Sequence, residues 1–290
     1  MKLIKPSVEI LEQGPGLQGI YDMIELCGKT SYKSPVKGGE EAKKFVEARI
    51  NEGHLAVLEF GTVYLRIDSQ GQISNSIWKI WGSPYSKLNY TGGINYLTTN
   101  YRVLVERDAL DALEYLCEPT EYHIKRYCAR FITDRGVSHE LVRHRTMSFC
   151  QESTRYCNYS KDKFGNELTF IIPSWSGNMR EGVFDDAMSL DWYWHSTDGR
   201  EPMIVNGKET QFLGVFNKAE QCYLEAIKLG CTPQEARQVL PNAIKTEICM
   251  CGFEEDWKHF FDLRCAKNAH PDMQVLANQL KDKFEEQGLI

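Results

Sequence analysis

Apolar residues recur at helical spacing in several segments of the chain. In residues 40–51, apolar positions three and four apart share one helical face, and Gly53 follows as a stop. Residues 232–235 read Thr-Pro-Gln-Glu, which supplies an N-cap, a proline at the first helical position and a capping-box glutamate. Further helices are predicted over residues 108–117, 216–229, 256–265 and 271–284.

Alternating apolar positions predict strands between these helices. The pattern is clear in residues 62–67 and 123–132, where every second side chain falls on one face. Other strands are predicted at residues 96–105, 168–172 and 246–251. After the strand at 123–132 we expect a turn at residues 133–136. A helix with Ser138 as its N-cap should follow and run through Arg143 to about Thr146.

The order of these elements favours one fold class. Helices and strands mix without the regular alternation that builds a parallel sheet, so we expect an α+β fold of mixed helices and antiparallel sheet. The sequence has no internal repeat and no long linker. We therefore expect a single domain over residues 1–290, with irregular insertions at about 68–95 and 174–210.

Composition narrows the class of protein. The chain has 290 residues, 42% of them hydrophobic and 26% charged, which is ordinary for a globular protein. Its apolar runs are shorter than the ~20 residues that span a bilayer, and the first residues do not resemble a signal peptide. We expect a cytoplasmic protein that uses no membrane.

The cysteines and the net charge exclude further classes. The ten cysteines form no CxxC pair, so reduced thiols are expected and a metal site is not. The net charge of -6 argues against a general binder of nucleic acid polymers. An acidic chain can still bind a small anion where it concentrates positive charge.

Such a concentration occurs at Arg143-His144-Arg145. An arginine fork suits phosphate or carboxylate. On a helix, successive side chains point ~100° apart, so these three would reach two ligands or two parts of a large one. The polar segment from Ser148 to Arg155 is expected to be a loop able to bind a nucleotide phosphate. From the residues alone, a solvated helix end whose cations complement the helix dipole is an equal alternative.

A longer motif distinguishes these readings. The pattern Arg143-His144-Arg145, seven residues, then Ser153 matches the RHR-x7-S signature of the flavin-dependent thymidylate synthases, and the match continues at Arg155-Tyr156. Four other segments resemble the same family in order, and the resemblance extends over about residues 20–285. They are Thr30-Ser31-Tyr32, Gly53-His54 with Glu59 as a GH-x4-E segment, residues 237–241, and residues 257–264.

The resemblance implies a chemistry and a set of site residues. It implies that FAD lies at the interfaces of a homotetramer, that NADPH reduces FAD, and that 5,10-methylenetetrahydrofolate gives a one-carbon unit to carbon 5 of dUMP. Reduced flavin then completes the methyl group, so neither Ser153 nor Cys150 needs to act as a nucleophile. The FAD-side candidates are Ser31, His54, Ala56, Glu59, Arg143, His144, Arg145, Gln151, Phe253 and His259. The dUMP-side candidates are Glu140, Arg143, Gln151, Glu152, Ser153, Thr154, Arg155, Arg237 and Arg264.

The resemblance also implies that Arg264 is catalytic: its guanidinium would lie at the uracil edge, favour ring ionisation and make carbon 5 more nucleophilic. The sequence departs from the family at Cys150, Phe253, Glu255 and His259, where many members have asparagine or arginine. Two alternatives stand beside synthase activity. One is a non-catalytic binder of nucleotide or RNA, and the other is an FAD-binding member without synthase activity.

Overall fold

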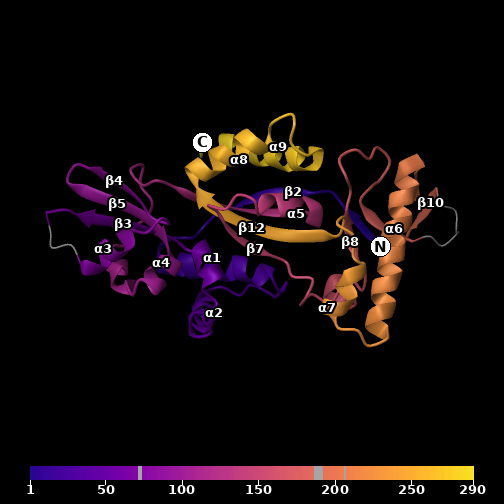
Figure 1. The fold of residues 1–290 in the computed structure, drawn as a ribbon, viewed down its shortest axis with the longest axis horizontal. Coiled ribbons are helices and arrows are strands. Elements are labelled where there is room, and N and C mark those ends of the chain that lie inside the picture. Colours follow the sequence, from indigo (N-terminus) through magenta and orange to yellow (C-terminus); the bar gives the residue numbers. More distant parts are fainter. Residues whose placement is uncertain (71–73, 186–191, 206) are drawn as a thin grey trace.

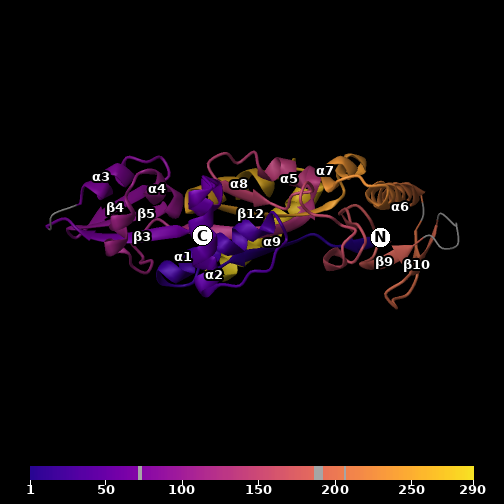
Figure 2. The ribbon, with the colours of Figure 1, turned by 90° about the horizontal axis from the view of Figure 1, so that it is seen from below.

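A four-stranded antiparallel sheet forms the centre of the molecule, and a lobe extends from each of its ends (Figures 1 and 2). This arrangement comes from a computed structural model that describes residues 1–70, 74–185, 192–205 and 207–290. Helices and antiparallel strands mix as the sequence predicts, so the α+β class is confirmed. The division into one domain with insertions stays a prediction.

The central sheet has the strand order β2-β6-β12-β7. Its strands are β2 (Ser7–Leu11), β6 (Arg126–Asp134), β12 (Lys245–Phe253) and β7 (Ser148–Gln151). The pairing of β6 with β12 runs from Arg126 opposite Phe253 to Asp134 opposite Lys245. β12 is buried along almost its whole length, because helices cover both faces of the sheet.

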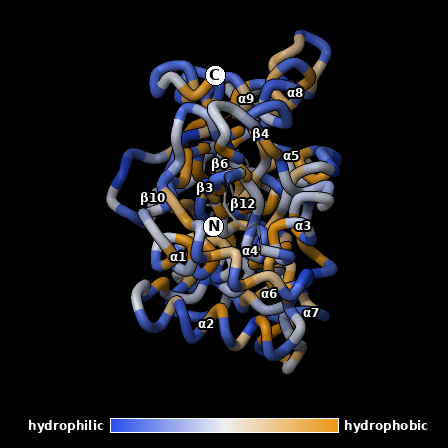
Figure 3. Tube along the Cα trace, turned by 90° about the vertical axis from the view of Figure 1, so that its left-hand side faces the viewer, coloured by the Kyte–Doolittle hydropathy of each residue, from blue (hydrophilic) through white to orange (hydrophobic). Residues whose placement is uncertain are grey.

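The two faces of the sheet carry different side chains. Ala129, Phe131, Ile248 and Met250 point to one face and pack against Trp257 and other apolar residues of the C-terminal helices. On the other face, Cys128 of β6 and Cys249 and Cys251 of β12 pack against Met23 and Cys27. Hydrophobic positions accordingly gather around β6 and β12, and the outer loops are mostly hydrophilic (Figure 3).

Helices lie on both sides of the sheet (Figure 1). On one side are α5 (Arg135–Leu141), α8 (Glu254–Arg264) and α9 (Pro271–Glu286). On the other are α1 (Gly16–Thr30), α2 (Gly39–Asn51) and the 3₁₀ helix η1 (Leu55–Phe60). The helices predicted at 40–51, 256–265 and 271–284 are confirmed as α2, α8 and α9.

The first lobe contains a three-stranded sheet of order β3-β5-β4. Its elements are β3 (Thr62–Asp68), α3 (Asn75–Trp81), β4 (Lys87–Thr91), β5 (Ile94–Asn100), α4 (Tyr101–Glu106) and η2 (Leu110–Tyr115). The strand predicted over 96–105 is wrong in its second half. Asn100 ends it, because its side chain accepts a hydrogen bond from the backbone N–H of Val103 and starts α4. Residues 108–117 hold a 3₁₀ helix instead of an α-helix.

The second lobe contains the sheet β11-β10-β9-β1-β8 and the long helix α6 (Gly207–Lys228). Its strands are β1 (Lys2–Ile4), β8 (Thr169–Ile171), β9 (Gly182–Asp185), β10 (Tyr193–Ser196) and β11 (Met203–Ile204). The segment 174–210 thus supplies three strands, and its residues 186–191 and 206 lie outside the described residues. The helix predicted at 216–229 is confirmed, although it begins earlier than expected.

Three short helical turns complete the chain. They are η3 (Asp162–Phe164), α7 (Pro233–Ala236) and η4 (Arg237–Val239). The capping box predicted at Thr232 and Glu235 is present: the Thr232 N–H donates to the Glu235 carboxylate over 2.7 Å. Among the described residues, no helix is long and apolar enough to cross a bilayer.

Candidate functional site

The Arg143-His144-Arg145 segment lies in a turn that follows α5. The predicted turn at 133–136 and the Ser138 N-cap are both wrong, because β6 continues to Asp134 and the Asp134 side chain caps α5 by accepting from Val137 N–H. The helix ends at Leu141, so it does not reach Thr146. It stops there because the chain must turn before residue 148, where β7 pairs with β12.

The turn separates the three side chains of the motif. The backbone N–H of His144 donates to the Leu141 carbonyl over 3.2 Å, and that of Met147 donates to the His144 carbonyl over 3.0 Å. His144 is buried at 7% exposure, whereas Arg143 and Arg145 are exposed. The turn therefore presents two arginines to solvent and directs the imidazole inward.

His144 meets two other predicted residues, Glu140 and Arg264. Arg264, the last residue of α8, donates from Nε to His144 Nε2 over 3.0 Å and from Nη1 to Glu140 Oε2 over 2.8 Å. Its Nη2 donates to the Glu140 backbone carbonyl over 2.9 Å. Burial, then the Arg264 charge, then His259 lower the pKa of His144 to about 4. His144 is therefore neutral at pH 7 and acts as a hydrogen-bond acceptor for Arg264.

This cluster holds Arg264 in one orientation without using all of its donors. A guanidinium has five N–H groups, and the three contacts above occupy one on each nitrogen. Within the described part of the chain, nothing accepts from the second N–H of Nη1 or of Nη2, so both remain for a ligand. The exposed His259 lies next to the cluster, with its ring centroid 6.2 Å from that of His144.

A second group of predicted residues lines a cleft of about 620 Å³ on the α1 side of the sheet. Ser31, His54, Ala56 and Ser153 all line it. The rings of Tyr32 and Tyr156 form part of the wall and lie 4.8 Å apart between centroids. The Ser153 N–H donates to the Ser31 carbonyl over 3.0 Å, which ties the end of the motif to the end of α1.

Two arginines that the sequence did not single out also line this cleft. Arg49 Nη2 donates to Glu52 over 2.8 Å, but its buried Nε has no hydrogen-bond partner among the described residues. Arg102 reaches the cleft while its Nη1 pairs with Glu59, a predicted FAD residue, over 2.5 Å. Arg49 pairs with Glu52, three residues on. Arg102 pairs with Glu106, four residues on, and with Glu59, 43 residues earlier, so no single sequence motif marks the two arginines.

The segment predicted to be a polar loop is partly a strand, because residues 148–151 form β7 at the edge of the central sheet. Gln151 Nε2 donates to Ser138 Oγ over 2.8 Å and to Thr246 Oγ1 over 3.1 Å. Thr154 is buried. The side-chain amide nitrogen of Gln151 is thus engaged within the chain, and β12 fixes the position of the segment.

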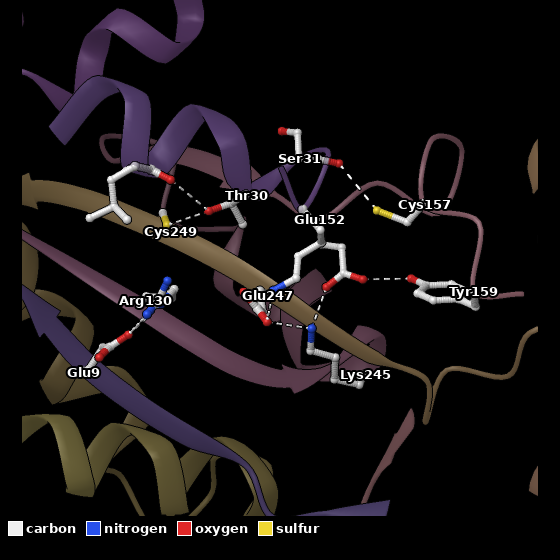
Figure 4. Close-up of polar contacts among 12 residues, drawn as sticks. Glu9, Thr30, Ser31, Arg130, Glu152, Cys157, Tyr159, Lys245, Glu247 and Cys249 are labelled. Carbon is white, nitrogen blue, oxygen red and sulfur yellow. Dashed lines mark hydrogen bonds and ion pairs between the residues drawn. The ribbon is translucent and has the colours of Figure 1, made fainter. Parts of the chain in front are cut away.

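Glu152 is the centre of a buried charge network (Figure 4). Its carboxylate accepts from Tyr159 Oη over 2.9 Å and from Lys245 Nζ over 2.7 Å. Lys245 also pairs with Glu247 over 2.7 Å, and Glu247 pairs with Lys33. Burial alone would lower the pKa of Lys245, but the two carboxylates outweigh it and raise that pKa. The network anchors the segment after β7 to β12.

The remaining predicted residues lie elsewhere on the chain. Arg155 is exposed and donates from Nε to Gln234 over 3.2 Å, and Arg237 is exposed in η4. Phe253 is buried at the end of β12, and the guanidinium of Arg126 lies 5.5 Å from its ring centroid. One chain therefore brings Glu140, His144 and Arg264 together and gathers a second set in the cleft. The central sheet separates these two sets.

Comparison with known proteins bears on this arrangement. Residues 123–287, more than half of the chain, match the model of the family described as thymidylate synthase complementing protein. The chain belongs to this family. The matched region contains the RHR turn, β7, β12 and α8. Of the predicted site residues, Ser31, His54, Ala56 and Glu59 lie before the region that matches the thymidylate synthase complementing family.

Individual relatives are distant. A flavin-dependent thymidylate synthase of Geobacter sulfurreducens is 27% identical over 146 residues, which cover 50% of each chain. A Pyrococcus furiosus protein of the same name is 28% identical over 150 residues, 52% of this chain and 50% of that one. The chain thus spans about half the length of these relatives. A UMP/dUMP methylase structure from Streptomyces cacaoi, bound with 5-Br dUMP, covers 99% of this chain and 93% of its own at 14% identity, with a TM-score of 0.43, too low to assign a fold or a substrate.

Proposed function

We propose that this protein is an FAD-dependent thymidylate synthase, which methylates dUMP to dTMP with 5,10-methylenetetrahydrofolate as the one-carbon donor and NADPH as the reductant. The observation that carries the proposal is the cluster of Glu140, His144 and Arg264 at the RHR turn. It orients a permanently charged guanidinium and leaves two of its N–H groups available. Family membership and the names of the relatives above support the same reaction.

The roles of the cluster follow from its hydrogen bonds. The two available N–H groups of Arg264 would donate to the uracil edge of dUMP and favour negative charge on the ring, which makes carbon 5 more nucleophilic. Neutral His144 accepts from Nε and prevents the guanidinium from rotating. Glu140 binds the other side of the same group. Arg264 is thus the proposed catalytic residue, and His144 and Glu140 position it.

The residues around the cleft fit part of a flavin dinucleotide. The fit rests on the unsatisfied Nε of Arg49, the aromatic wall of Tyr32 and Tyr156, and a volume of about 620 Å³, which is within the usual range of ~300–1,000 Å³ for small-molecule sites. Ser31, His54 and Ala56 would hold FAD here. Glu59 does not line the cleft but pairs with Arg102, which does. Bound FAD would supply the redox chemistry that completes the methyl group.

The separation of the two residue sets leads to the proposal of a homotetramer. The cleft lies on the α1 side of the central sheet and the Arg264 cluster lies on the α8 side, so one chain cannot surround one ligand with both. Arg143 and Arg145 are exposed, as are Val142 and Leu263 beside them. We propose that another copy of the chain presents its cleft to this surface and completes the site.

Mixed oligomers test this arrangement. His54→Ala and Arg264→Ala would each inactivate the protein alone. Co-expressed, the two variants should regain part of the activity, because some interfaces then combine an intact cleft with an intact Arg264 cluster. Two inactive variants on the same side, Arg264→Ala with His144→Ala, provide the matched control. Recovery that is no greater than in this control would contradict a shared site.

The activity itself is tested by release of tritium from carbon 5 of labelled dUMP, with methylenetetrahydrofolate and FAD, in the presence and absence of NADPH. We expect release that needs NADPH, survives Cys150→Ala and is lost in Arg264→Ala. Bound FAD without tritium release would indicate a member that lacks synthase activity. Absence of FAD binding would contradict the proposal and favour a nucleotide binder.

A further inference from the structure

A second cavity, separate from the cleft, has a volume of about 330 Å³. It lies where the edge of the central sheet meets the start of α1 and the first strand of the β3-β5-β4 lobe, and it shares no lining residue with the cleft. Its walls are largely apolar and come from segments far apart in the sequence: Ile10, Ile20, Met23, Phe60 and Leu289. The proposed synthase reaction gives this cavity no role.

One buried cation lines the cavity. Arg126, the first residue of β6, is 7% exposed. Its Nη1 donates to the Glu59 carbonyl over 3.1 Å and to Thr62 Oγ1 over 3.3 Å. Among the described residues, no carboxylate lies within ion-pair distance of this guanidinium, and neither Nε nor Nη2 has an acceptor. Its guanidinium lies 5.5 Å from the centroid of the Phe253 ring, and arginine stays charged in proteins. An anion in the cavity would therefore add the opposite charge that the described residues do not place beside Arg126.

The unused donors define the chemistry that Arg126 can recognise. Nε and Nη2 form the side edge of the guanidinium, which grips a carboxylate through two parallel hydrogen bonds. The opposite end of the group is fixed by Thr62 and the Glu59 carbonyl. A flat anion with two oxygens is the ligand that would satisfy both remaining nitrogens.

The mouth of the cavity limits the charge of that ligand. Glu12 and Glu118 line it and are exposed, and Glu118 accepts from the Gly16 N–H over 3.0 Å. Carboxylates at the entrance repel phosphates and other multiply charged anions, while the buried guanidinium balances a single negative charge. The volume is at the lower end of the usual range for small-molecule sites, ~300 Å³.

We propose that this cavity binds a small monocarboxylate with an apolar body. The carboxylate pairs with Nε and Nη2 of Arg126, and the apolar part packs on Ile10, Ile20, Met23 and Phe60. The inference does not rest on the proposed synthase function, because none of these residues belongs to the Arg264 cluster or the cleft.

Calorimetric titration of the full chain with hexanoate tests the proposal, with hexan-1-ol as the uncharged match and acetate as the headgroup alone. We expect hexanoate to bind at least about tenfold more tightly than either, since a charge-assisted pair and apolar burial both contribute. Arg126→Gln should weaken hexanoate binding about 10- to 100-fold. Arg130→Gln is the control, because Arg130 lies on the same strand but pairs with Glu9 outside the cavity.

A second variant decides the matter if Arg126→Gln does not fold. Leu289 lines the cavity and is only partly buried, so a larger side chain at this position would extend into the cavity. Leu289→Trp should fill the cavity and remove hexanoate binding while tritium release is retained. Equal binding of hexanoate and hexan-1-ol, no hexanoate binding to the wild-type protein, or unchanged binding in either folded variant would overturn the proposal.

Discussion

Protonation of His144 should destabilise the folded protein. The imidazole accepts the Arg264 Nε–H at Nε2, so a proton added there removes the acceptor and places two cations in contact. The side chain is buried, and its pKa falls to about 4 from the ordinary value of 6.5, chiefly through burial and then through the charge of Arg264. The unfolded chain has neither of these effects.

The magnitude follows from the difference between the two pKa values. Because the unfolded chain binds the proton more readily, the stabilisation is fully present above pH 6.5 and is lost as the pH falls from 6.5 to 4. The free energy of unfolding should fall by about 2 kcal/mol between pH 7 and pH 5, and by about 3 kcal/mol once the pH is below the folded-state value.

Urea denaturation of the wild-type protein and of His144→Gln, each at pH 7 and at pH 5, measures this loss of unfolding free energy. Glutamine can still accept a hydrogen bond from Arg264 but does not titrate, so the variant should lose about 2 kcal/mol less than the wild type between pH 7 and pH 5. His123, whose pKa burial also lowers, contributes equally to both proteins and cancels. An equal loss in the two proteins, or an NMR titration that places the His144 pKa near 6.5, would refute the reasoning.

Three further substitutions test other contacts. Lys245→Met leaves the buried Glu152 carboxylate without its cation and should cost about 3–5 kcal/mol in urea denaturation, with part of the loss recovered when Glu152→Gln is added. Hydrogen bonds from residues 176–178 outweigh burial and lower the pKa of Glu209 to about 2. Glu209→Gln should therefore cost about 1–3 kcal/mol at pH 7. Its deficit against the wild type should shrink as the pH falls from 4.5 toward 2, because the unfolded wild-type chain takes up a proton at Glu209 that the folded chain does not. Gly61→Ala would place Cβ 2.7 Å from the nearest atom of Ile24 and should lower stability by about 1–3 kcal/mol, whereas Gly82→Ala, with nothing within 4 Å, should be neutral in thermal unfolding.

The sequence predicted those elements that local patterns specify. The apolar stripe of α2 and the Thr232–Glu235 capping box both act within a few residues, and both are present. β7 was missed because Ser148–Gln151 is short and mixed in polarity, and it is a strand only through pairing with β12, about 100 residues later. The start of α5 was misplaced because Asp134 serves both as the last residue of β6 and as the helix N-cap.

The motif likewise identified candidate residues without revealing how they assemble. Arg264 contacts Glu140 from 124 residues away, and periodicity cannot show a contact of that length. The cysteines on β6 and β12 gave no sign that they fill the face against α1, which places the cleft opposite the RHR turn. Because the sheet separates the two sets of residues, one chain cannot place both sets around one ligand. A ligand large enough to touch both sets must then lie between copies of the chain, and the mixed oligomers of His54→Ala and Arg264→Ala measure that directly.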